Sequence, residues 1–182
     1  MACRDLVKVP RTRRDHIAHT FPRVPPPSGP AEFRQALGSL PTGVTVVTAM
    51  APDGPTGATA GAVTSLSLEP PMMLACLDRD SRTLKAARAA GHFGVNGLAD
   101  GQRELAVRFS SKDPHSEKWR GVDWSESTGM PRIAGSLLWV ACELNEEIDG
   151  GDHMILTGRV LQAEGAAGDP LVFYGGAYRP LD

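Results

Sequence analysis

The sequence lacks the features that mark several large classes of protein. Its three cysteines, Cys3, Cys76 and Cys142, are far apart and form no CxxC pair, which argues against a disulfide framework and a zinc site. No apolar stretch approaches the ~18 residues of a membrane span, and the N-terminus has no apolar signal region. The net charge of −2 is unlike that of a nucleic-acid-binding protein. We therefore expect a cytoplasmic protein that binds neither membrane nor nucleic acid, with Cys76 and Cys142 as inert core thiols.

Two further absences constrain the chemistry. The dinucleotide fingerprint GxGxxG does not occur, so any nucleotide must be held in another way. No catalytic triad or metal-ligand cluster is recognisable either, which disfavours reactions that need a strong acid, a strong base or a metal ion.

The length of 182 residues suits one domain with a substantial core. Residues 1–30 differ from the rest, because they hold six basic and two acidic side chains and six prolines. This composition predicts a poorly ordered N-terminal arm followed by a folded domain over residues 31–182.

The folded part is rich in β-branched runs and turn residues, with only short stretches of helical spacing. We expect helices over 31–40, 81–90 and 100–109, and strands over 44–49, 56–68, 72–77, 92–98, 135–148, 152–164 and within 170–180. Asp53-Gly54 predicts a hairpin turn, whereas Glu69-Pro70-Pro71 predicts a turn without ladder pairing. Residues 110–132 read as a long loop with at most one helical turn, anchored by Trp119 and Trp124. Six or seven strands with short helices favour a closed or split β-barrel.

The stretch over residues 57–83 carries the first functional hypothesis. Its first half is rich in Gly, Ala, Ser and Thr, so a ligand ring can approach the backbone closely, and Val63, Leu66 and Leu68 suit one apolar face. The apolar run 72–77 should be buried. Ser81 and Thr83, at the start of the next helix, can offer hydroxyl and N–H groups to a phosphate. The alternative is that Ser81 or Thr83 is a simple helix N-cap.

Several segments, taken together and in this order, resemble the short-chain flavin reductase family, whose members supply reduced flavin to two-component monooxygenases. They are PTGVTVVTA (41–49), GATAGAVTSLSLEPPMML (57–74), SRT (81–83), HFGVNGLADGQRELAVRF (92–109), GDHMILTG (151–158) and PLVFYGGAYRPL (170–181). The resemblance implies an antiparallel FMN-binding split β-barrel, mainly β with short helices, that forms a homodimer. It also implies FAD or FMN as flavin, NADH (favoured over NADPH) as hydride donor, and a flavin-dependent monooxygenase as partner.

The resemblance also implies site residues, segment by segment. The flavin ring would lie along Thr59, Ala60, Gly61, Ala62, Val63, Thr64 and Ser65. The flavin phosphate would lie at Ser81 and Thr83, and Phe109 and Ser110 would approach the flavin. Gly151, Asp152 and His153 would place the nicotinamide, with His153 beside its ring, and Tyr178 would border that pocket.

Some alternatives stay open on the sequence alone. His153 taken by itself is better explained as a strand histidine that is hydrogen-bonded to Asp152 or to a carbonyl, and only the GDH context favours the functional role. Gly61 and Val63 replace side chains that are common in the family, which leaves the choice between FMN and FAD undecided. The rival functions are a non-catalytic flavin- or haem-binding barrel for storage or sensing, and an oxidase of the pyridoxamine-phosphate type. The GDH motif at 151–153 disfavours both, and no Arg/Lys/Tyr cluster suited to pyridoxal phosphate is evident.

Overall fold

The computed structural model describes residues 29–181, so the predicted N-terminal arm lies almost entirely outside the described part. The elements, in chain order, are α1 (Pro30–Leu37), β1 (Thr42–Gly43), β2 (Thr45–Ala51), β3 (Gly54–Ala60), β4 (Val63–Leu68), β5 (Pro71–Asp78), α2 (Arg82–Ala90), β6 (His92–Gly97), the 3₁₀ turn η1 (Asp100–Gln102), α3 (Arg103–Ser110), α4 (His115–Lys118), β7 (Trp124–Ser127), β8 (Met130–Ile133), β9 (Leu138–Gly150), β10 (His153–Gly165), β11 (Val172–Tyr174) and β12 (Ala177–Arg179).

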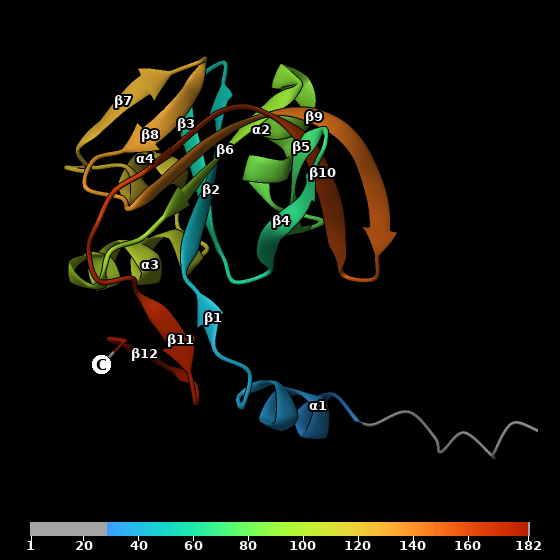
Figure 1. Ribbon diagram of the computed structural model, residues 1–182, viewed down its shortest axis with the longest axis vertical. Coiled ribbons are helices and arrows are strands. Elements are labelled where there is room, and N and C mark those ends of the chain that lie inside the picture. Colours follow the sequence, from blue (N-terminus) through green and yellow to red (C-terminus); the bar gives the residue numbers. More distant parts are fainter. Residues whose placement is uncertain (1–28, 182) are drawn as a thin grey trace, which may run out of the picture.

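The main sheet has the strand order β3-β2-β6-β9-β10-β5-β4, and its neighbouring strands pair antiparallel. The two end strands, β3 and β4, follow each other in the chain and are joined only by Gly61 and Ala62. So short a connection forces the sheet to curl until its two ends meet. The curled sheet is visible in Figure 1. It confirms the predicted mainly β, antiparallel split barrel with short helices.

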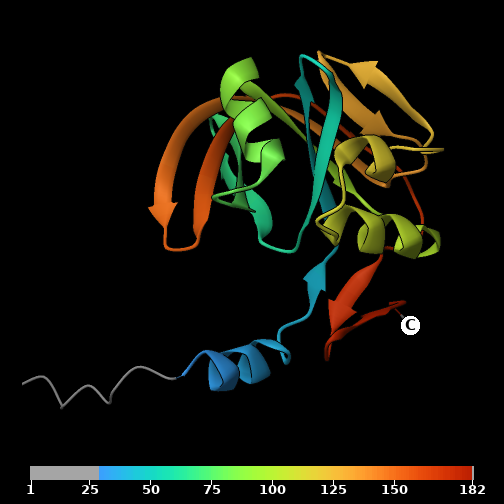
Figure 2. The same cartoon turned by 180° about the vertical axis from the view of Figure 1, so that it is seen from behind.

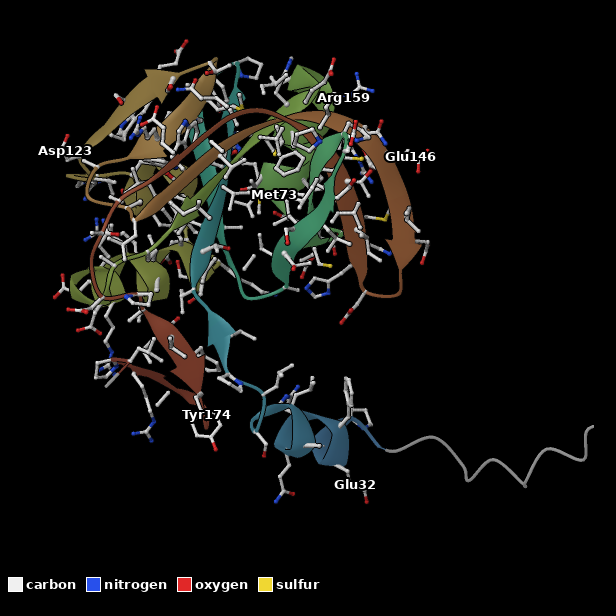
Figure 3. All side chains as sticks on the ribbon, viewed as in Figure 1. Glu32, Met73, Asp123, Glu146, Arg159 and Tyr174 are labelled. Atoms are coloured by element: carbon white, nitrogen blue, oxygen red, sulfur yellow. The ribbon has the colours of Figure 1, made fainter. Side chains whose placement is uncertain are left out.

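Two apolar clusters hold the helices on this barrel. The first cluster contains Val47, Leu84, Phe93 and Leu156 and joins α2 to the sheet. Met73 of β5 packs against this cluster from within the curve of the sheet (Figure 3). The second cluster includes Val46, Ala106, Phe109, Trp119 and Ile133 and joins α3, α4 and β8 to the other side. From behind, α2 and the α3–α4 pair therefore flank β3 (Figure 2).

The segment 56–68, predicted as one strand, is two strands at opposite ends of the sheet. The break falls at Gly61-Ala62, where the chain leaves β3 and the carbonyl of Ala62 accepts a hydrogen bond from the N–H of Cys76 at 2.9 Å. The turn at Glu69-Pro70 is present, but Pro71 pairs with Leu68 as the first residue of β5, which corrects the prediction that it takes no part in the ladder. Proline is tolerated there because a strand's first residue can do without its N–H donor.

The burial predicted for the run 72–77 is only partly confirmed, and the apolar residues of β4 are largely exposed. Leu66 and Leu68 are 48% and 90% exposed, because β4 is an end strand and no part of residues 29–181 buries these side chains. In the run 72–77 only Ala75 and Leu77 are buried. Cys76 is half-buried rather than a core thiol, whereas Cys142 is fully buried and its burial raises its pKa to about 12.

The long loop predicted over residues 110–132 contains more structure than expected. Its single helical turn, α4, was anticipated, but the hairpin β7–β8 was missed. Trp119 is buried and packs edge-on against the half-buried Trp124, with ring centroids 5.5 Å apart. At the next turn, β9 continues to Gly150, beyond the predicted start of the turn at Glu146.

A small lobe projects from one end of the barrel (Figure 1). In this lobe β1, β11 and β12 form a three-stranded sheet. The N–H of Gly175 donates a hydrogen bond of 2.9 Å to the carbonyl of Gly38, the residue that follows α1. The predicted helix over 31–40 exists, but it stops at Leu37 because Gly38 caps it. Its apolar side chains, Phe33 and Leu37, are 58% and 46% exposed, so this helix buries no face within the described chain.

Candidate functional site

The first wall of the site is β3, an end strand whose only hydrogen-bonded neighbour strand within residues 29–181 is β2. Its other edge consequently offers backbone N–H and C=O groups that a ligand can bind. Its residues are small, from Thr56 to Ala60, so little side-chain volume stands over the backbone. The Thr59 hydroxyl donates to the Ala106 carbonyl at 2.7 Å, which ties this wall to α3.

The second wall is the start of α2, which directly follows the bend after β5. Ser81 is the N-cap, and its hydroxyl accepts a hydrogen bond from the Leu84 N–H at 3.4 Å. The capping alternative is therefore confirmed for Ser81, and capping leaves other N–H groups of the first turn unpaired. Thr83 is buried at 2% exposure beside the cavity. The cation next to it, Arg82, is already ion-paired with Asp53.

The third wall comes from the end of α3 and the chain that leads into α4. Phe109 is 1% exposed and packs edge-on against Trp119, with ring centroids 4.9 Å apart. Gly57 makes this approach to β3 feasible, because a Cβ there would lie 2.8 Å from the Phe109 ring. Ser110, Ser111 and the residues 112–115 continue this wall.

The fourth wall is His153, the first residue of β10, which pairs in register with Asp78 of β5. Its Nδ1 lies 2.8 Å from Oδ1 of Asp152, as the structural alternative anticipated. The hydrogen bond and charge of His153 lower the pKa of Asp152 below its ordinary value. The imidazole itself remains 46% exposed, so its other face can still contact a ligand.

Arg79 braces the turn before His153. Its Nε donates to the Gly151 carbonyl at 2.6 Å, its guanidinium pairs with Asp149, and its backbone N–H donates to the Asp152 carbonyl at 3.1 Å. The Gly151 N–H donates to Asp149 at 3.0 Å, and this bond, with Arg79, lowers the pKa of Asp149. One side chain therefore joins the bend before α2 to the turn that carries His153.

These walls enclose a cavity of about 630 Å³, within the range of sites that bind small organic ligands. Nine predicted site residues line it: Thr59, Ala60, Gly61, Ala62, Ser81, Thr83, Phe109, Ser110 and His153. The structure does not bring the other six into the lining. Val63, Thr64 and Ser65 belong to β4, beyond the break in the predicted strand, and Gly151 and Asp152 only flank His153. Tyr178 lies in β12 and packs on Phe173, with ring centroids 5.3 Å apart.

Sequence reasoning missed part of the lining. Cys76, Leu77, Asp78 and Asp80 come from the end of β5 and the bend after it, and Lys112, Asp113, Pro114, His115 and Lys118 come from the segment 110–132. The length of that predicted loop was the available clue, since long loops are often functional. Which of its residues turn inward was not readable from any local pattern.

The arrangement suits a flat ring system that carries an anionic group. A strand edge with small residues can face a ring, and the start of a nine-residue helix can hold a phosphate. Among residues 29–181, no group of three or more His, Cys, Asp or Glu side chains could hold a metal ion. The same residues include no helix with the length and apolarity that a membrane crossing requires.

Comparison with known proteins gives consistent matches. Residues 37–182 match the family described as "Flavin reductase like domain". The chain is 39% identical over 157 residues to the flavin-dependent monooxygenase reductase subunit HsaB of Mycobacterium tuberculosis, covering 84% of this chain and 83% of that protein. It is 39% identical over 161 residues to the FMN reductase (NADH) SmoA of Agrobacterium fabrum, covering 88% of this chain and 90% of that protein. The solved structure of the NADH:FAD oxidoreductase SgcE6 of Streptomyces globisporus superposes with a TM-score of 0.78 at 35% identity, covering 87% and 99%.

Proposed function

The chain belongs to the flavin reductase like family, and on that premise we propose that it transfers hydride from NADH to flavin and supplies the reduced flavin to a partner monooxygenase. The observation that carries this proposal is the cavity beside β3. It combines a small-residue strand edge, a helix N-terminus and an exposed imidazole within one space.

The residues present fit a flavin. Gly57 and the small residues up to Ala62 leave room for a ring system against the backbone of β3. The start of α2, with Ser81 and Thr83, fits a phosphate because the helix dipole and free N–H groups favour an anion. The bound flavin supplies the hydride-accepting chemistry.

The chain's own residues position the reactants and exclude water. Phe109, held by Trp119, closes the cavity on the α3 side. His153, braced through Asp152 and Arg79, orients the nicotinamide at the other end. No side chain needs to act as a strong acid or base, because hydride transfer depends on contact and alignment of two rings.

Six residues predicted to contact the flavin or the nicotinamide do not line the cavity. We propose that Gly151 and Asp152 act by orienting His153 rather than by touching the flavin, since they flank it outside the cavity lining. Val63, Thr64, Ser65 and Tyr178 lie outside the lining of a single chain, and their predicted role stays a prediction. The domain boundary at residue 30 and the cytoplasmic location likewise stay predictions.

We also propose that the chain forms a homodimer through the outer face of β4. Leu66 and Leu68 on β4 are exposed apolar residues, a pattern that favours a protein interface. Leu68→Asp should convert dimers to monomers at micromolar concentration, as measured by light scattering after size exclusion. Val107→Asp, at an exposed apolar residue of α3, is the control. A dimer that persists in Leu68→Asp would assign the interface elsewhere.

The function is tested by mixing the purified protein with NADH and separately with FMN and FAD, and following loss of the reduced-nicotinamide absorbance. Turnover that depends on added flavin is the expected result. The better flavin settles a choice on which the relatives differ, since one is named for FMN and another for FAD. Flavin binding without turnover with NADH or NADPH would instead favour the non-catalytic barrel, a reading that the relatives do not support.

A further inference from the structure

Lys118 is a buried cation in the wall of the cavity. It ends α4 and is only 9% exposed, although it lines the same space as Ser81, Thr83 and Ser110. Within residues 29–181, the other charged side chains of this lining are exposed or half-buried. Lys118 is thus the least exposed charged residue of this lining.

The protein itself does little to balance this charge. The Nζ of Lys118 donates to the Phe109 carbonyl at 3.2 Å, which uses one of the three donors of an ammonium group. In the described part of the chain, no carboxylate oxygen lies within 4.0 Å of it, whereas Arg82 on the opposite wall is paired with Asp53. Burial lowers the pKa of Lys118, and the charge of Asp113 only partly opposes this effect. A partly desolvated cation without a close counter-ion is unfavourable, so an anionic partner would stabilise it.

The surroundings place that partner inside the cavity. The helical turn α4 and the helix α2 both pack on β3, from opposite sides. His115 lies 3.8 Å from Asp53, which pairs with Arg82 at the start of α2, so the two elements approach each other at one end of the cavity. Lys118 ends the helical turn that His115 begins, and it lines the same cavity as Ser81 and Thr83.

We propose that Lys118 completes an anion subsite with Ser81 and Thr83 and binds a phosphate of the flavin. The proposal rests on the proposed function for the identity of the ligand, but not for the existence of the subsite. The pyrophosphate of NADH offers the same chemistry, and the experiment separates these two sources.

The test compares FMN with riboflavin, which has the same ring system and no phosphate. Lys118→Met keeps the length and packing of the side chain and removes its charge. We expect it to weaken FMN binding by roughly tenfold to a hundredfold, the range for losing a charged hydrogen bond, and to leave riboflavin binding unchanged. Lys85→Met is the matched control, since Lys85 is exposed on α2 and lies outside the cavity lining; there we expect an effect of about twofold or less.

The source of the phosphate is read from turnover with riboflavin as acceptor. If Lys118 serves the flavin, Lys118→Met leaves the KM for NADH in this assay unchanged. A raised KM for NADH with unchanged FMN binding would overturn the assignment to flavin and give the subsite to the nucleotide.

A structural role predicts different results. If Lys118 only anchors Phe109, Lys118→Met weakens FMN and riboflavin binding equally and lowers the melting temperature of the ligand-free protein; that pair of results would overturn the subsite. If Lys118 awaits an anion, the ligand-free variant melts at the same or a higher temperature, and FMN raises it less than in the wild type. Lys118→Met could weaken FMN binding but not riboflavin binding while the wild-type protein fails to oxidise NADH. That result would support the subsite and reject the reductase function.

Discussion

Gly57 offers the sharpest test of the site's geometry, because a single methyl group added there meets the aromatic wall. A Cβ at position 57 would lie 2.8 Å from Cδ1 and Cε1 of Phe109 and 3.3 Å from Cζ2 of Trp119. Both rings are buried and pack edge-on against each other, so neither can turn away freely. Gly57→Ala should therefore lower the free energy of unfolding by about 1–3 kcal/mol, the usual cost of overpacking a core.

The expected change can be measured in two ways. For a chain of this size, thermal unfolding should shift by about 2–4 °C for each kcal/mol lost. Because Phe109 lines the cavity, its displacement should also weaken flavin binding, which a fluorescence titration measures.

The matched control is Gly165→Ala, at a strand glycine with no atom within 4 Å of its added Cβ. There we expect unchanged stability or a gain of about 0.4–1 kcal/mol from the stiffer unfolded chain. If Gly57→Ala has the same melting temperature as Gly165→Ala and binds flavin normally, Phe109 does not pack on β3 as described.

His153→Ala should raise the KM for NADH more than the KM for flavin. The control His92→Ala, at a residue outside the cavity lining, should change neither KM. Equal changes of both KM values in His153→Ala would return His153 to a purely structural role. The pKa of Asp149 is lowered by the Gly151 N–H and Arg79, so its contribution to stability is present above the ordinary value of 3.8 and is lost as pH falls through the lowered value. The melting-temperature gap between wild type and Asp149→Asn should therefore be widest near neutral pH and close in acid; a gap that is constant with pH would contradict this brace.

Much of the site was predictable where its residues are close in the sequence. The small residues 59–62 and the helix start at Ser81 and Thr83 were identified together, because strand composition and helix capping depend on neighbouring residues. His153 came from a resemblance, and the structure places it on the same cavity.

The errors share one physical origin. Gly61-Ala62 looked like the interior of a strand, but the chain turns there to reach the far end of the sheet, which removes Val63, Thr64 and Ser65 from the lining. Leu68 was assigned to an apolar strand face, yet it is exposed, because local alternation cannot tell an end strand without a covering layer from an inner strand.

The sequence by itself determined the mainly β architecture, the capped start of α2 and the small-residue strand, since these follow from local propensity and backbone freedom. Only the tertiary structure decided which residues share one cavity. Closure of the sheet brings β3, α2, α4 and the start of β10 together although they are distant in the chain. The fold also buries Lys118 in the cavity lining, although its segment reads as a polar loop. Its burial depends on contacts across the fold, which no local pattern encodes.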